Sequence, residues 1–306
     1  MKKIIGPAGL MIHGIHKDDQ KPLSQGSISC KNFEKIIIKL KKRILNADEW
    51  IYKTRKQILN SKDLCITLDD NLRSQVKYGI PILKKYKIKA FFFVYTSVYK
   101  KKNYEFELFR YFYNLKYPSF ESFFNDFLKF ILNTGYKNRI KKINKNKLEN
   151  YLKKYKFYSK SDKYFRYLRD ELLTPLEFKR LSILFMKKKK FNYKSKKNFQ
   201  KIWITKNEIK KISNLGHHIG LHSYDHNKNI YKMKYINQMY QYKKNYNDIK
   251  KITGVFPKSA SYPFNSHNKD SKQILKNLDI DHVFLARHNI TDKNNFEINR
   301  YDIKEI

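Results

Sequence analysis

Two adjacent carboxylates and two histidines four residues apart are the side chains of this sequence best suited to chemistry. Asp69 and Asp70 directly follow one apolar run, and His222 and His226 follow another. Adjacent carboxylates repel each other, so a fold retains the pair where a cation or a proton separates their roles. Two imidazoles and one carboxylate leave a fourth position open for water on a metal ion, as in catalytic zinc sites. Two alternatives remain: an aspartate that caps the next helix, and histidines that are ordinary surface or core residues.

The surrounding sequence alternates between short apolar runs, typical of buried strands, and amphipathic segments, typical of helices. We predict strands at 10–13, 64–68, 90–94, 218–221, 259–262, 282–286 and 298–303, and helices at 32–45, 76–87, 206–215, 236–252 and 269–278. Pro81 breaks or kinks the second of these helices, so two short helices are an equal alternative there. The alternation favours an α/β fold with parallel strands, whose carboxyl ends meet at one edge, where β/α barrels carry their chemistry.

The alternation stops in the middle of the chain. There the sequence is rich in Lys, Tyr, Phe and Asn, has almost no glycine, and places aromatic residues such as Phe120 and Phe127 at helical spacing. We predict a basic, mainly helical insertion at 98–202, within a β/α domain formed by 1–97 and 203–306. The aromatic stripe is interpreted as helix core. Binding of single-stranded nucleic acid by interleaved aromatics and lysines is the alternative.

The charge balance is strongly basic. The chain has 67 Lys and Arg against 27 Asp and Glu, a formal net charge of +40. Such an excess is typical of proteins that bind nucleic acid, anionic lipid or acidic glycan. Because Lys, Asn, Ile and Tyr recur along the whole chain, a general compositional bias explains the charge equally well.

The cysteines and the N-terminal segment bear on the cellular compartment in which the protein is expected. Cys30 and Cys65 lie far apart and have no metal-binding spacing, so we expect no disulfide framework and interpret Cys65 as a small buried apolar residue. The apolar stretch 4–15 is interrupted by glycines, a proline and a histidine. We interpret it as a core strand, not as a secretory signal, and predict a cytoplasmic protein. No stretch has the roughly 20 consecutive apolar residues of a membrane-spanning helix.

Three segments then carry a family resemblance. They are Thr-Leu-Asp-Asp-Asn at 67–71, Gly-His-His-Ile-Gly-Leu-His-Ser-Tyr-Asp-His at 216–226, and Ser-Tyr-Pro-Phe at 261–264. They resemble the motifs Thr-Phe-Asp-Asp-Gly, Gly-His-Glu-Ile-Gly followed by His-Ser/Thr-x-x-His, and the Ala-Tyr-Pro-Phe variant of Arg-x-Pro-Tyr. These are motifs of the polysaccharide deacetylases with a NodB homology domain, also called carbohydrate esterase family 4. The resemblance covers about 10–97 and 203–303 and implies a distorted (β/α) barrel.

The resemblance also implies roles for individual residues. It implies a divalent metal ion, in the first instance zinc, held by Asp70, His222 and His226. Asp69, free of the metal, would be the general base that takes a proton as water attacks the acetamide. The backbone N–H of Phe264 would stabilise the developing oxyanion.

The general acid is inferred from a different segment. Many relatives supply a histidine from a C-terminal Leu-x-His motif, which does not occur at the end of this chain. Some relatives instead use an N-terminal segment of the type Met-x-His-His, and Met-Ile-His-Gly-Ile at 11–15 is similar to it. His13 is therefore the candidate acid and His16 the second choice. The alternative is that His13 is an ordinary residue at the end of a strand.

Three positions depart from the family motifs. Ser261 stands where the motif has the arginine that orients the base, so Asp69 needs another residue to position it or works poorly. Asn71 replaces a glycine, which is tolerable because Asn adopts left-handed backbone more easily than most residues. His218 replaces a glutamate and, at the far end of its strand from His222, is expected to be structural.

These inferences lead to an expected function. The protein is predicted to be a metal-dependent hydrolase of C–N bonds that removes acetyl from an N-acetylated sugar, in surface-glycan or sugar-precursor metabolism. Expected partners are an N-acetylated sugar or glycan intermediate and, through the lysine excess, an anionic lipid carrier or membrane surface, but not nucleic acid. The alternative is a catalytically decayed barrel that binds anionic glycan, lipid or nucleic acid through its basic surface, and the missing arginine favours it.

Overall fold

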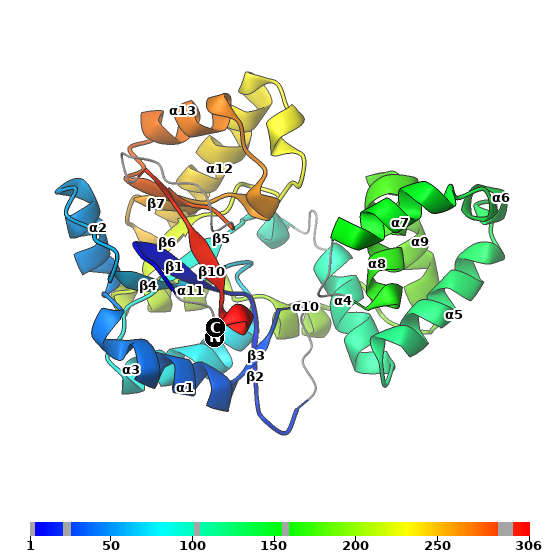
Figure 1. Ribbon diagram of the computed structural model, residues 1–306, viewed down its shortest axis with the longest axis horizontal. Coiled ribbons are helices and arrows are strands. Elements are labelled where there is room, and N and C mark those ends of the chain that lie inside the picture. Colours follow the sequence, from blue (N-terminus) through cyan, green and yellow to red (C-terminus); the bar gives the residue numbers. More distant parts are fainter. Residues whose placement is uncertain (1–3, 21–25, 101–104, 155–158, 287–295) are drawn as a thin grey trace. The chain divides into compact units, whose positions relative to one another are not determined.

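The chain divides into two compact units, which are described separately. The computed structural model describes residues 4–20, 26–100, 105–154, 159–286 and 296–306 (Figure 1). The first unit comprises Met1–Tyr104 and Gln200–Ile306, and the second comprises Glu105–Phe199. Their assignment as a deacetylase barrel and a basic insertion stays a prediction.

The first unit is built on an eight-stranded parallel sheet. In spatial order its strands are β10 (Arg300–Asp302), β1 (Ala8–Ile12), β4 (Leu64–Leu68), β5 (Phe91–Val94), β6 (His218–Leu221), β7 (Ser259–Ser261), β8 (His282–Phe284) and β9 (Glu297–Ile298). A separate parallel pair is formed by β2 (Ile15–His16) and β3 (Ile28–Ser29). The predicted parallel β/α architecture is confirmed.

One bent strand brings the two edges of this sheet together. Only Asn299 separates β9 from β10, yet β9 pairs with β8 and β10 pairs with β1. The N–H of Leu285 donates to the carbonyl of Ile298 at 2.8 Å, and the N–H of Gly9 donates to that of Asn299 at 2.9 Å. The segment predicted as one strand at 298–303 therefore lies between β8 and β1, and the sheet forms a nearly closed, distorted barrel.

Helices cover the outside of this barrel. They are α1 (Cys30–Leu40), α2 (Ala47–Arg55), α3 (Ile80–Lys85), α11 (Lys206–Asn214), α12 (Tyr235–Thr253) and α13 (Lys269–Asn277). Figure 1 shows α12 and α13 on one side of the strands and α1 and α3 on the opposite side. Around Pro81 the expected break takes the form of a π-helical turn, Gln75–Gly79, followed by α3 with the proline in its first turn.

The strands alternate strictly between an outer and an inner face, as pleated strands must. Outward residues such as Ile66 and Phe92 join helix residues such as Ile37 and Ile249 in the main apolar core. Inward residues form a second cluster with α2, which packs across the amino-terminal end of the barrel; its members are Ala47, Trp50, Ile51, Cys65, Phe91, Phe93, Phe284 and Ile298. The barrel interior is thus a packed apolar core, and the polar residues that also point inward are exceptions in it.

The second unit is helical. It contains α4 (Glu105–Lys116), α5 (Phe120–Leu132), α6 (Lys137–Lys141), α7 (Lys145–Lys154), α8 (Lys160–Tyr167), a π-helical turn (Leu168–Leu172) and α9 (Pro175–Lys188), while α10 (Lys196–Ile202) spans the unit boundary. Phe109, Phe127 and Phe185 lie in its centre, with ring centroids of Phe127 5.2 Å from Phe109 and 5.1 Å from Phe185. The aromatic stripe is therefore core, as predicted. Among the described residues, no helix combines the length and apolarity needed to cross a bilayer.

His282 is an unusual polar member of the barrel interior. It is fully buried, and within the described part of the chain neither ring nitrogen has a hydrogen-bond partner. The rings of Trp50, Phe91 and Phe284 surround it at centroid distances of 6.4, 5.4 and 5.0 Å. Burial lowers the pKa of His282 from 6.5 to about 3. The imidazole therefore stays neutral in the folded protein at pH values where an exposed histidine is protonated.

This burial predicts a pH-dependent stability. Between pH 6.5 and about 3 the unfolded chain binds a proton at His282 that the folded chain does not, so the free energy of unfolding falls as pH decreases. The share of His282 at pH 5 is about 2 kcal/mol. His282→Leu should weaken the decline between pH 8 and pH 5 in urea denaturation. It should not abolish it, because His217, whose pKa burial lowers to about 4, acts in the same direction. An unchanged decline would contradict this assignment.

Candidate functional site

The structure brings Asp70, His222 and His226 together at the carboxyl-terminal edge of the barrel. Asp70 Oδ1 lies 3.3 Å from His222 Nε2 and 3.0 Å from His226 Nε2. The ligand atoms of the three residues all lie within 4.8 Å of one another. Asp70 follows β4, and the two histidines follow β6, two strands away in the sheet. One carboxylate oxygen and two imidazole nitrogens at this spacing are a donor set that fits a divalent metal ion.

Left-handed backbone places these side chains. Asp70 has φ 74°, Asn71 has φ 41° and His226 has φ 54°, all in a region that non-glycine residues rarely adopt. Neighbouring side chains of a regular strand point to opposite faces, so the turn at Asp70 is what lets both adjacent carboxylates reach the site. Asn71 compensates for the missing glycine with its side chain, which accepts a hydrogen bond from Tyr95 N and donates one to Tyr99 Oη, both at 3.3 Å.

Buried hydrogen bonds orient His222. Its Nδ1 donates to the carbonyl of Ser261 at 2.9 Å, so Nε2, 3.3 Å from Asp70 Oδ1, is the nitrogen available to a cation at the site or, when protonated, to Asp70 itself. Its backbone N–H donates to Asn245 Oδ1 at 3.1 Å, and the Asn245 amide donates to the carbonyl of Val94 at 3.0 Å. Asn245 of α12 therefore ties the ends of β5 and β6 together beneath the histidine.

The ring of His226 is held by aromatic neighbours. Tyr95 stacks on it at a centroid distance of 5.1 Å, and the ring of Phe264 lies 4.8 Å away. Phe264 sits in a 3-10 turn, Pro263–Asn265, has φ 53° and is 52% exposed. The residue predicted as the oxyanion donor thus lies beside the metal-ligand cluster, with its side chain open to solvent.

Asp69 has different partners from its neighbour Asp70. Arg300 Nη1 donates to Asp69 Oδ1 at 2.8 Å, and Ser261 Oγ donates to Asp69 Oδ2 at 3.3 Å. Burial acts to raise the pKa of the Asp69 carboxyl, but the charge and hydrogen bond of Arg300, together with His222 and His13, outweigh it and hold the pKa below its usual range. Sequence reasoning missed Arg300, because a single arginine in a chain so rich in basic residues gives no motif signal.

The electrostatics of Asp70 follow the same pattern with histidines as partners. Burial acts to raise the pKa of its carboxyl, but His226 and His222 together hold it well below the usual range. Both carboxylates are therefore ionised at neutral pH. Each is stabilised by its own cationic or hydrogen-bonding partners.

His13 and His16 are separated by their surroundings. His13 follows β1, the strand paired with β4, and lies within electrostatic reach of the carboxyls of Asp69 and Asp70. Gly26 packs beside the His13 ring: a Cβ at that position would lie 3.4 Å from His13 Nδ1, an ordinary contact, and it is the φ of 74° that favours glycine there. His16 instead pairs with Ser27, Nδ1 to Oγ, at 2.7 Å. The choice of His13 as the general acid, with His16 as the second candidate, stays a prediction.

The two histidines that begin β6 have structural partners. His217 Nδ1 accepts a hydrogen bond from Ala90 N at 3.0 Å, so this ring is held neutral between two strands. His218 Nε2 lies 2.5 Å from Asp48 Oδ1 of α2, at the amino-terminal end of the barrel. His218, which replaces the glutamate of the family motif, thus lies at the opposite end of the barrel from His222, as the sequence suggested.

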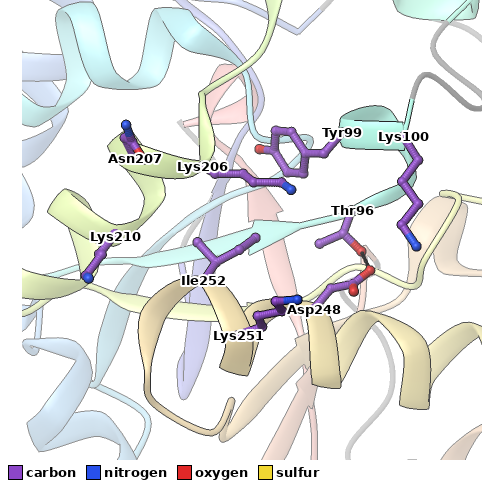
Figure 2. A pocket seen from close by; sticks show the side chains of 9 residues that line it. All are labelled: Thr96, Tyr99, Lys100, Lys206, Asn207, Lys210, Asp248, Lys251 and Ile252. Atoms are coloured by element: carbon purple, nitrogen blue, oxygen red, sulfur yellow. Dashed lines mark hydrogen bonds between the residues drawn. The ribbon is translucent and has the colours of Figure 1, made fainter.

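A separate hollow of about 260 Å³ lies outside the barrel (Figure 2). It is lined by Thr96, Tyr99, Lys100, Lys206, Asn207, Lys210, Asp248, Lys251 and Ile252. Its one carboxylate, Asp248, accepts a hydrogen bond from Thr96 Oγ1 at 3.0 Å. Four ammonium groups beside one carboxylate disfavour a cation, so this hollow is not a second candidate for the metal.

A parallel β/α barrel with a carboxylate and two histidines at its carboxyl edge is the arrangement that the motif resemblance implied. Residues 182–283 match the family model described as Polysaccharide deacetylase. This match, over about a third of the chain, agrees with the family that the motifs indicated. The assignment to the branch with Tyr-Pro-Phe in the third motif stays a prediction. No curated protein matches the chain in sequence.

Several solved structures share the fold. The Streptococcus pyogenes deacetylase PplD in complex with acetate aligns with a TM-score of 0.57 at 14% identity, over 96% of this chain and 90% of that one. IcaB from Ammonifex degensii gives 0.53 at 14% identity, over 96% and 89%. A de-N-acetylase from Aggregatibacter actinomycetemcomitans gives 0.54 at 13% identity, over 96% and 93%. At these identities the similarity establishes the fold.

The role of Asn245 can be tested apart from catalysis. Asn245→Ala removes one hydrogen-bond partner from each of two buried backbone groups, the N–H of His222 and the carbonyl of Val94, which should lower the free energy of unfolding by about 1–3 kcal/mol. The peptide of His222 is then held through its 3.3 Å bond to the Val94 carbonyl, so zinc affinity should fall by about 10–100-fold. Thermal unfolding and zinc titration against a chelator measure the two effects. Asn247→Ala, at an exposed position of the same helix, is the matched control. Equal behaviour of the two variants would refute the anchoring role.

Proposed function

We propose that this protein is a metal-dependent hydrolase that removes the acetyl group from an N-acetylated sugar. The observation that carries the proposal is the convergence of Asp70, His222 and His226 beside a second buried carboxylate, Asp69, that has separate partners. A metal site and a free base within one edge of a barrel are the two components that amide hydrolysis by activated water requires. The deacetylases among the structural neighbours support the same reaction class.

Each residue has a distinct role in the proposed reaction. A divalent ion, in the first instance zinc, held by Asp70, His222 and His226 would acidify a bound water toward pKa ~7 and polarise the amide carbonyl. Asp69 accepts the proton of the attacking water, and the N–H of Phe264 donates to the oxygen that becomes negative.

His13 would complete the reaction. It donates a proton to the sugar nitrogen as the C–N bond breaks, because an amide anion is a poor leaving group. The products are acetate and the free amine of the sugar.

The substrate proposed is a glycan, or a precursor of one, that carries N-acetyl groups. The lysine excess would complement a phosphate-bearing carrier or an anionic membrane surface, and the cytoplasmic location predicted from the sequence forms part of this proposal. The alternative of a decayed, purely binding barrel rested on the missing arginine at position 261. The ion pair between Arg300 and Asp69 removes that argument.

Two neighbouring substitutions separate the base from the metal ligand. Asp69→Asn should retain stoichiometric zinc and lower the rate of acetate release by about 10²–10⁴-fold, the usual contribution of a general base. Asp70→Asn should lose both zinc and activity. Elemental analysis and an acetate assay with an N-acetylated glucosamine oligomer measure these outcomes. Acetate release that survives both substitutions and treatment with EDTA would sink the proposal.

The proposed acid can be isolated by the choice of substrate. His13→Gln should slow acetate release from an acetamido sugar by about 10²–10⁴-fold. It should leave hydrolysis of an activated aryl acetate nearly unchanged, because the phenolate leaving group of this ester departs without protonation. His16→Gln is the matched control and should keep both activities, since His16 pairs with Ser27. An equal loss on both substrates would assign His13 to structure.

A further inference from the structure

Arg300 is a buried side chain of the barrel interior that makes several hydrogen bonds. It is 1% exposed, and an arginine remains protonated even there. Its Nη1 donates to Asp69 Oδ1 at 2.8 Å, its Nη2 donates to Ser261 Oγ at 2.8 Å, and its Nε donates to the carbonyl of Leu285 at 3.2 Å. Three strands, β4, β7 and β8, are thus connected through one guanidinium.

The interior is shaped to admit this side chain. Gly9 pairs with Arg300 in register across β1 and β10, and a Cβ on Gly9 would lie 2.9 Å from Arg300 Cγ. The rings of Phe93 and Phe284 flank the guanidinium carbon, each centroid at 6.0 Å. Phe284 would also lie 3.1 Å from the same Cβ. The absence of a side chain at Gly9 and the two aromatic rings thus form the space that the Arg300 side chain occupies, and its guanidinium reaches Asp69.

Ser261 occupies the position where the resembled motif carries an arginine. Its hydroxyl accepts from Arg300 Nη2 and donates to Asp69 Oδ2, so it bridges the guanidinium and the carboxylate. A serine is short enough to leave the space that the guanidinium fills. The small residue on β7 and the long residue on β10 are therefore complementary.

We infer that Arg300 is the positioning residue of the general base, with its guanidinium supplied from β10 and received by Ser261 on β7. The inference rests on the proposed function, in which Asp69 is that base. Arg300 holds Oδ1 and so fixes the plane of the carboxylate, while Oδ2, with only the longer bond from Ser261, is directed to the attacking water. A lysine cannot reproduce this arrangement, because an ammonium is a point charge without the planar fork.

The first test replaces the planar guanidinium of Arg300 with an ammonium group and keeps the positive charge. Arg300→Lys should lower kcat about 10–100-fold, the usual cost of losing an orienting partner, with KM for the acetamido sugar and zinc content unchanged. Arg55→Lys is the matched control. Arg55 also makes a bidentate pair with an aspartate, Asp281, at 3.1 and 2.9 Å, but at the amino-terminal end of the barrel. This control should keep the wild-type kcat.

The second test asks whether Arg300 acts through Asp69. In an Asp69→Asn background, Arg300→Lys should cause no further loss of kcat, because the base it positions is already gone. The exchange variant Ser261→Arg with Arg300→Ser contains the same residues on swapped strands. It should regain at least tenfold in kcat over Arg300→Ser alone, a gain that a purely structural arginine does not predict.

The outcomes separate this inference from the proposed function. A wild-type protein that releases no acetate in the presence of zinc refutes the proposed function. An active wild type in which Arg300→Lys lowers kcat equally with and without Asp69 refutes the positioning role alone. A change confined to KM or to zinc content refutes it as well. Where Arg300→Ser does not fold, Arg300→Lys in the two backgrounds still decides the question.

Discussion

Two ionised carboxylates adjacent in sequence and almost fully buried are the constraint on which this structure depends. Burial of a charge is costly unless a counter-charge or several hydrogen bonds accompany it. Asp69 meets this requirement with Arg300, and Asp70 meets it with His222 and His226. The two sets of partners belong to different residues, although Ser261 contacts both Asp69 and His222. In the proposed reaction, the left-handed turn at Asp70 separates the base, Asp69, from the metal ligand, Asp70.

The closing strand serves both architecture and chemistry. Pairing of β9 with β8 and of β10 with β1 closes the sheet, and the same strand carries Arg300 into the interior. The inward residues on the amino-terminal side of Arg300 are mostly apolar. The guanidinium and Asp69 therefore meet in surroundings of low dielectric constant, where their attraction is strong. In the proposed mechanism, the strand that closes the barrel also positions the base.

Much of this arrangement could be predicted from the sequence, for identifiable reasons. Apolar runs that end on Asp69 and on His222 indicated parallel strands with a shared edge, and the structure joins them there. Helix α2 was missed because its surface-facing residues are charged and only a few apolar residues mark its buried face. Arg300 was missed because its meaning lies in contacts with strands far away in sequence. Local patterns carry no trace of such pairings.

The distance along the chain between Asp69 and Arg300 has a consequence for biosynthesis. The two residues are 231 positions apart, so the carboxylate leaves the ribosome long before its counter-charge exists. Until then the edge of β4 has to remain hydrated or shielded, since Asp69 lacks the partner that allows its burial. Contacts of such high sequence separation form slowly. The nascent barrel therefore stays open until the strand that carries Arg300 has been made.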